Sequence, residues 1–206
     1  MSLNEHFQSR KGILRYQQKT TCPTSASEAY SLGITAKEAA FQTYILLIEH
    51  CNDTSIKKTL KTMANLEKRE IILFSSWMNF ELNCTCSAFY ESNGQALPSQ
   101  LNEIECVHLT PQVNCFLDVF YKKIDQLKQS VLTLGGDDLT KHRRIKDAEV
   151  TFAASLQARQ ICQQLFEDMA ALYVDEEIRN AFQNMVEILE KNNENLKNDY
   201  TKRVVL

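Results

Sequence analysis

The sequence predicts an all-α protein: a four-helix bundle of two helical hairpins joined by a long crossover that holds an extra helix. The chain of 206 residues has 5 Gly and 3 Pro, where average composition gives about 14 and 10. Because all-β and α/β folds need many turns and glycine-rich loops, this shortage argues against both. Apolar residues also recur every three or four positions through several long stretches, which is typical of amphipathic helices.

The first hairpin is expected from residue 25 to 83, after a polar N-terminal extension, 1–24, with a short helix near 3–16. Thr24-Ser25-Ala26-Ser27-Glu28 is rich in N-cap residues and predicts a helix start. The turn Asn52-Asp53-Thr54 separates two patterns of about 25 to 30 residues each, which span roughly 40 Å as helices. Their spacing is carried by Ala29, Leu32, Gly33, Ala36, Ala40, Tyr44 and Leu47, then by Ile56, Leu60, Met63, Ala64, Leu66, Ile71, Leu73, Phe74, Trp77, Met78 and Leu82.

The crossover is expected over residues 84–136, inside a bundle domain of residues 25–206. Its first part is irregular, with Asn93-Gly94, Pro98 and Pro111 as turn markers. Residues 112–134 then predict a strongly amphipathic helix, through Val113, Phe116, Leu117, Phe120, Ile124, Leu127, Val131 and Leu134. We expect this helix to complete the core; the alternative is that it covers a homodimer interface.

The second hairpin follows Gly135-Gly136-Asp137-Asp138, which ends the crossover and caps the next helix. One helix is expected to run to about Tyr173, and Asp175-Glu176-Glu177 opens the last one. The spacing is carried by Ala148, Phe152, Ala153, Leu156, Ile161, Leu165, Phe166 and Met169, then by Ile178, Phe182, Met185, Val186, Leu189, Leu196 and Tyr200.

Charge and cysteine content exclude several classes of function. A formal net charge of −3 gives no basic footprint for nucleic acid, and no apolar run reaches the ~18 residues of a membrane span. The start MSLNEHFQSRKG lacks the apolar segment of a signal peptide. The 7 cysteines form no CxxC pair, and the spacing of Cys84, Cys86, Cys106 and Cys115 is not that of a zinc ribbon. We therefore expect a cytoplasmic protein with free thiols.

The two hairpins resemble each other and a known family. Ser27-Glu28-Ala29-Tyr30-Ser31-Leu32-Gly33-Ile34-Thr35-Ala36-Lys37-Glu38-Ala39-Ala40, with Tyr44, resembles the first helix of rubrerythrin-like members of the ferritin-like superfamily. Leu60-x-x-Met63-Ala64-x-x-Glu67-x-x-Glu70 is similar to their second helix. In the second hairpin, Phe152-x-x-Ser155-x-x-x-Arg159-x-x-Cys162-x-x-x-Phe166 and Phe182-x-x-Met185-Val186-x-x-Leu189-x-x-Asn192 repeat the two patterns. The likeness covers residues 25–83 and 148–200.

The resemblance implies a di-iron site that this chain has lost. Family members take a Glu from each of two helices and Glu-x-x-His from the other two. Here the first Glu position holds Lys37 and its counterpart holds Arg159, and neither cation has a lone pair for a metal. The two His positions hold Glu70 and Asn192, and the last Glu position holds Leu189. Glu67 alone keeps the family's residue.

Lys37, Arg159, Glu67 and Glu70 would form a charge-balanced set inside the bundle. Because a buried charge costs several kcal/mol unless it is paired, we expect these four residues to form an internal salt-bridge cluster in place of the metals. An alternative helix register turns Glu38 and Glu190 inward and gives an all-carboxylate set of Glu38, Glu67, Glu70 and Glu190, with Gln160 and Gln163 brought inward on the third helix. Such an oxygen-rich site would suit a hard cation better than redox iron.

The expected function is a non-redox binding or structural role, with a small apolar ligand or another protein as partner and no cofactor. One alternative is a divergent ferritin-like oxidoreductase that binds Fe or Mn. Another is a helical interaction module that shares only its packing with rubrerythrins. The four histidines, His6, His50, His108 and His142, form no ligand-spaced pair, and no nucleophile-elbow, P-loop or dinucleotide motif occurs.

Overall fold

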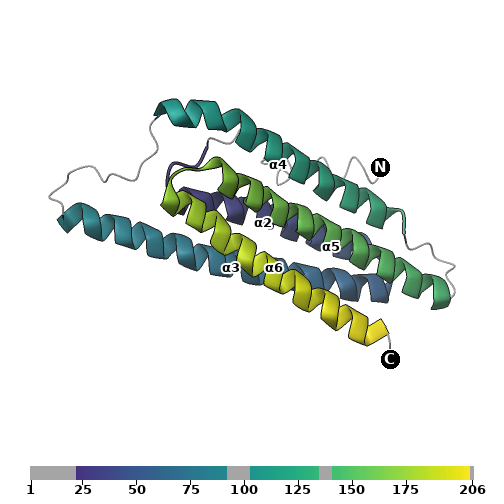
Figure 1. Ribbon diagram of the computed structural model, residues 1–206. Helices are drawn as coiled ribbons and strands as arrows, with labels where there is room; N and C mark the ends of the chain where they lie inside the picture. Colours follow the sequence, from purple (N-terminus) through teal and green to yellow (C-terminus); the bar gives the residue numbers. More distant parts are fainter. Residues whose placement is uncertain (1–21, 92–102, 135–140, 205–206) are drawn as a thin grey trace.

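The chain is all-α, as the composition predicts. The computed structural model describes residues 22–91, 103–134 and 141–204, and within these ranges it contains five helices and no strand. They are α2 (Ala26–His50), α3 (Thr54–Glu91), α4 (Glu103–Leu132), α5 (Lys141–Leu172) and α6 (Glu176–Val204). All five run roughly along one long axis (Figure 1).

Local sequence explains where three of the helices begin. Ser25 is the N-cap of α2, and its hydroxyl accepts a hydrogen bond from the backbone N–H of Glu28 at 3.3 Å. Asp53 caps α3 by accepting from the N–H groups of Ser55 and Ile56 at 2.8 and 2.9 Å. Asp175 caps α6 in the same way, through Glu177 and Ile178 at 3.0 and 3.1 Å. The turns predicted at Asn52-Asp53-Thr54 and Asp175-Glu176-Glu177 are therefore confirmed and equivalent.

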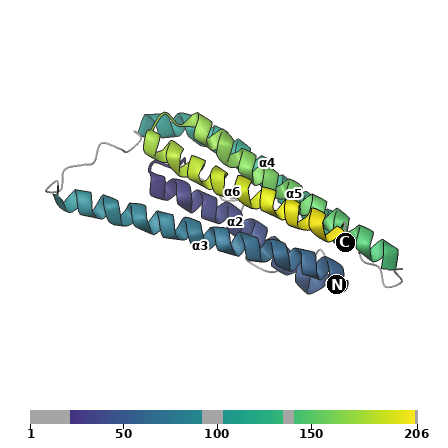
Figure 2. The same cartoon turned by 60° about the horizontal axis from the view of Figure 1, so that its bottom comes forward.

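The helices pack as two hairpins with α4 laid over them. α2 pairs with α3 and α5 with α6, while α2 and α3 also contact the second hairpin through α6 and α5, respectively. α4 lies against α5 and α2, on the side of the bundle away from α3 (Figures 1 and 2). Its predicted apolar stripe is buried, at Val113, Leu117, Phe120, Ile124, Leu127 and Val131. The prediction that this helix completes the core is confirmed.

A single offset relates the two hairpins. Residues of the second hairpin lie 122 positions after their counterparts in the first, as Asn192 lies after Glu70. The same offset pairs Lys37 with Arg159 and the cap Asp53 with Asp175, and the links between the helices of each hairpin span three residues, 51–53 and 173–175. The internal repeat therefore runs without insertion or deletion through the centre of the bundle.

The crossover is more helical than expected. α3 continues to Glu91, past the expected boundary at residue 84, and α4 begins at Glu103 rather than near residue 112. Pro111, expected at a turn, lies inside α4, so that prediction is wrong. A proline removes one backbone donor from a helix, and the ordered apolar stripe from Val113 onward holds the helix together beyond it. The turn markers at 93–94, 98 and 135–136, and the N-terminal helix near 3–16, lie outside the described residues.

Within the part of the chain that the structure describes, no helix combines the length and the apolarity needed to cross a membrane.

Candidate functional site

Four buried charged side chains meet at the centre of the bundle. Lys37 comes from α2, Glu67 and Glu70 from α3, and Arg159 from α5. The Lys37 Nζ lies 2.7 Å from Glu67 Oε2 and 2.7 Å from Glu70 Oε2. The Arg159 Nη2 donates to Glu70 Oε1 at 2.5 Å, and its Nη1 donates to Glu67 Oε1. Each of the four carboxylate oxygens thus faces a cationic nitrogen.

The helix geometry explains how these side chains converge. Glu67 and Glu70 are three residues apart, so they project from one face of α3. Lys37 shares a buried stripe of α2 with Gly33, Ala40 and Tyr44. Gly33 lets α6 approach closely, since a Cβ added there would lie 2.3 Å from the Met185 Sδ.

The cluster is sealed from water. Exposed fractions are 0% for Lys37 and Glu67 and 1% for Glu70 and Arg159. An isolated charge at such depth costs several kcal/mol, but two cations and two anions with short contacts compensate one another. The cluster has no net formal charge, so its burial leaves no uncompensated charge in the core.

Mutual attraction keeps Lys37, Glu70 and Arg159 ionised. Burial lowers the pKa of the Lys37 ammonium, but the charges of Glu67 and Glu70 outweigh it and hold that pKa above its usual value. The same balance raises the pKa of the Arg159 guanidinium. Burial alone would raise the pKa of Glu70, but the positive charges of Lys37 and Arg159 have the larger combined effect, so its pKa lies below the usual value.

Two adjacent asparagines of α6 complete the hydrogen bonding. Asn192 Nδ2 donates to Glu70 Oε1 at 2.8 Å, and Arg159 Nε donates to Asn193 Oδ1 at 2.9 Å. Asn193 then donates to Gln163 Oε1 at 3.2 Å, and Gln163 donates to Glu167 at 2.9 Å. This chain of amides leads from the buried guanidinium toward the half-buried outer part of α5.

Buried groups next to the charges are held neutral. Burial, together with the charge of Glu67, raises the pKa of the Tyr44 phenol, while Arg159 and the Ser155 hydroxyl act in the opposite direction. Burial also raises the pKa of the Cys162 thiol to about 12, against the influence of Lys37. Neither side chain has the accessibility of a nucleophile, because both lie within the core.

The structure brings together Lys37, Glu67, Glu70 and Arg159, the four residues that the sequence singled out for a salt-bridge cluster. The alternative all-carboxylate register is wrong: Glu38 and Glu190 are exposed on the outer faces of α2 and α6. At about 100° per residue, the helix phase that buries Lys37 turns Glu38 outward, and the phase that buries Leu189 does the same to Glu190. Gln160 is also exposed.

Asn193 contacts the salt-bridge cluster, although the favoured register did not include it. That register placed Asn192 in the bundle. In the structure, both contribute, because their amide groups reach different partners on α3 and α5. Two consecutive amide side chains next to the buried Leu189 were the available signal.

Histidines and cysteines do not add a second centre to the described part of the chain. His50 is half-buried at the end of α2 and His108 is exposed on α4. Cys84 and Cys115 are exposed free thiols, while Cys22 and Cys162 are buried ones. The side chains of Cys86 and Cys106, and His6 and His142, lie outside the described residues. Among the residues described, no three His, Cys, Asp or Glu side chains are grouped closely enough to hold a metal ion.

No family model, no curated protein and no solved structure matches this chain.

Proposed function

We propose that this chain is a ferritin-like, rubrerythrin-like protein in which an internal salt-bridge cluster has replaced a di-iron site. It serves in the cytoplasm as a non-redox binding or structural protein. The main observation in support is the position of Lys37, whose ammonium lies 2.7 Å from one oxygen of Glu67 and 2.7 Å from one oxygen of Glu70. A single positive charge between two carboxylates of neighbouring helical turns takes the role that a bridging metal has in the family.

The internal repeat supports the proposal. Lys37 and Arg159 are counterparts under the 122-residue offset, and the resemblance assigns a metal-binding Glu to both positions. Both positions hold a buried cation that binds the same two carboxylates. Replacing two ligands and two metals by two cations preserves charge neutrality at the centre of the bundle.

The donor set does not fit a pair of divalent metal ions. Each oxygen of Glu67 and Glu70 already faces an ammonium or guanidinium nitrogen, and Leu189 and Asn192 stand where the family has Glu and His. A metal would need to displace two cations that could not leave the core without breaking it, because Lys37 and Arg159 are both fully enclosed. We therefore assign no metal-dependent step to the protein.

The burial of Glu67 and Glu70 also favours this proposal over a helical interaction module with only generic packing. In a generic module these carboxylates would lie on a solvated face; here they are 0% and 1% exposed.

Metal analysis of the full-length protein tests the proposal. Protein expressed in medium supplemented with iron and manganese is expected to retain well below one metal ion per chain. The matched positive control restores the family's ligands at the same frame, through Lys37→Glu, Glu70→His, Arg159→Glu, Leu189→Glu and Asn192→His. Two metal ions per unmodified chain, the stoichiometry of a di-iron carboxylate site, would overturn the proposal.

A further inference from the structure

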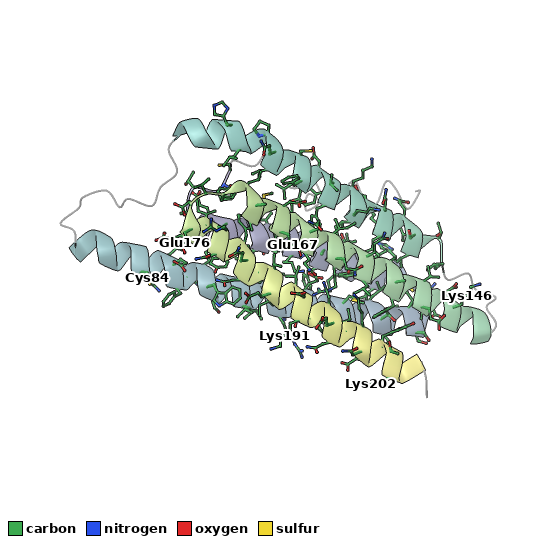
Figure 3. All side chains as sticks on the ribbon, in the orientation of Figure 1. Cys84, Lys146, Glu167, Glu176, Lys191 and Lys202 are labelled. Atoms are coloured by element: carbon green, nitrogen blue, oxygen red, sulfur yellow. The ribbon has the colours of Figure 1, made fainter. Side chains whose placement is uncertain are left out.

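A groove of about 570 Å³ opens at the end of the bundle where α5 begins and α6 ends. Its walls come from the start of α3, the start of α5 and the last turns of α6, and they include Thr62, Glu149, Phe152, Leu196, Asp199 and Tyr200. In Figure 3, this end of the molecule is the one labelled with Lys146 on α5 and Lys202 on α6, and the opposite end is labelled with Glu176 and Cys84. The volume falls in the range of small-molecule sites.

The internal repeat identifies a counterpart of this groove near the opposite end. The 122-residue offset carries Phe152 to Tyr30, Leu196 to Phe74 and Asp199 to Trp77. The walls are therefore built twice from equivalent positions, and at one of these positions the groove has an aspartate where its counterpart has an indole.

Trp77 fills the counterpart. Its ring lies 5.6 Å from that of Tyr30 and 5.7 Å, stacked, from that of Phe74, measured between ring centroids. Tyr30 is fixed in turn, because Asn184, the counterpart of Thr62, donates a hydrogen bond to its hydroxyl at 3.0 Å. The Trp77 indole therefore shows how a planar ring packs against Tyr30 and Phe74, the counterparts of the groove residues Phe152 and Leu196.

At the open groove, Asp199 stands at the position that Trp77 has in the counterpart, so a negative charge replaces the indole. Phe152 and Tyr200 stack at 3.7 Å and form an aromatic wall. The groove is lined by two carboxylates, Glu149 and Asp199, and by one cation, Lys58. Among the described residues, none of these three side chains forms an ion pair. Burial raises the pKa of the Tyr200 phenol, and the negative charge of Glu149 raises it further.

We propose that this groove binds a planar aromatic amine, with the ring in the place that Trp77 occupies in the counterpart and the ammonium group against Asp199 and Glu149. The ring buries apolar surface against Leu196 and the stacked pair of Phe152 and Tyr200, and the carboxylates accept charge-assisted hydrogen bonds from the amine. The site lies apart from the central salt-bridge cluster and does not depend on how that cluster arose.

Calorimetric titration of the full-length protein with tryptamine tests the site, with indole-3-propionate as the same ring carrying the opposite charge. Tryptamine is expected to bind with a Kd below about 1 mM, and indole-3-propionate at least tenfold more weakly (on the order of one carboxylate–ammonium contact). Equal binding of the two probes, or no binding of tryptamine, would overturn the proposal.

Variants separate the ring site from the charge site. Asp199→Trp places an indole where the counterpart has one; it is expected to abolish tryptamine binding while leaving the thermal midpoint unchanged or higher. Asp199→Asn keeps the groove open and is expected to weaken tryptamine binding by roughly fivefold to tenfold. Asp125→Asn removes an exposed aspartate from α4, outside the groove, and is the matched control with unchanged binding. A lower thermal midpoint in Asp199→Trp, or unweakened binding in it, contradicts the proposed seat of the ring.

Discussion

Asn192 of α6 donates a hydrogen bond to Glu70 of α3 at 2.8 Å, and these two residues occupy equivalent positions in the two hairpins. A contact between equivalent positions places both next to the axis that relates the halves of the bundle. Lys37 and Arg159, the other equivalent pair, bind the same carboxylates from opposite sides. The charged centre is therefore where the two halves meet.

Removing Lys37 should destabilise the protein strongly. Lys37→Ala leaves two buried carboxylates with one cation, and losing one partner of a buried pair lowers the free energy of unfolding by about 3 to 5 kcal/mol. Urea denaturation followed by circular dichroism measures it. Glu38→Ala, on the exposed side of the same helix, is the matched control and should change stability by less than about 0.5 kcal/mol. Equal midpoints for the two variants would show that the cluster contributes nothing.

Replacing the whole cluster should be far less damaging than removing one member. Lys37→Met, Glu67→Leu, Glu70→Leu and Arg159→Met together leave no unpaired charge, and such apolar replacements of buried ion pairs are often neutral or stabilising by about 1 to 4 kcal/mol. The fourfold variant should therefore be at least as stable as the unmodified protein, whereas each single variant is less stable. Additive single-variant losses would contradict the mutual compensation described above.

The cluster should give a broad plateau of stability with pH. The pKa of Glu70 is lowered by folding, so its contribution is present above its unfolded pKa of about 4.3 and is lost as the pH falls through the folded value. The pKa of Lys37 is raised, so its contribution is present below about 10.4 and is lost as the pH rises through the folded value.

Denaturation midpoints from pH 3 to 10 measure this profile. The difference in unfolding free energy between the unmodified protein and the fourfold apolar variant is expected to stay flat from about pH 5 to 10 and to shift against the unmodified protein at lower pH. A slope between pH 6 and 8 would contradict it.

Trp77 should stabilise its end of the bundle. Trp77→Asp gives this position the residue that its counterpart, Asp199, has in the groove. The change is expected to lower the free energy of unfolding by about 1 to 3 kcal/mol, which is below the range for fully buried aromatic residues because Trp77 is half-buried. Phe80→Asp, on the same helix at a side chain 65% exposed, is the control and should cost about 0.5 kcal/mol or less. Equal losses in the two variants would remove Trp77 as a template for a ligand ring.

Thiol labelling should distinguish the core cysteine from the surface ones. Cys84 and Cys115 are exposed and should react with iodoacetamide within minutes at pH 8, whereas Cys162 is buried with its pKa raised to about 12. Peptide mapping by mass spectrometry is expected to find Cys162 modified only after denaturant is added. Modification of Cys162 in the native protein at the rate of Cys84 would contradict its place in the core.

Helix phase explains how much of this centre was accessible from the sequence. The spacing of Gly33, Lys37, Ala40 and Tyr44 places Lys37 on the apolar face of its helix, and the same holds for Glu67 and Glu70 between Met63 and Phe74. A charge on an apolar face needs a partner, so two cations and two anions predicted one another.

The parts that resisted prediction depend on tertiary contacts. Pro111 is a turn former by local preference, but α4 is held through it by packing against α2 and α5. The two consecutive amides Asn192 and Asn193 mark this part of α6, but nothing in the local sequence shows that the Asn193 carbonyl oxygen faces Arg159, which lies 34 positions earlier. The groove is defined by a side chain that is small where its counterpart is large, and this becomes visible only when the two hairpins are compared in space.

The distribution of charge between the halves constrains how the chain assembles. The first hairpin brings Lys37 together with Glu67 and Glu70 and carries one excess negative charge in its interior, while the second brings only Arg159 and carries one positive charge. Two copies of the same half would bury like charges against each other, which is costly. Docking of unlike halves is the neutral combination, so the charged centre favours the pairing of a first hairpin with a second hairpin and disfavours the pairing of two equivalent hairpins.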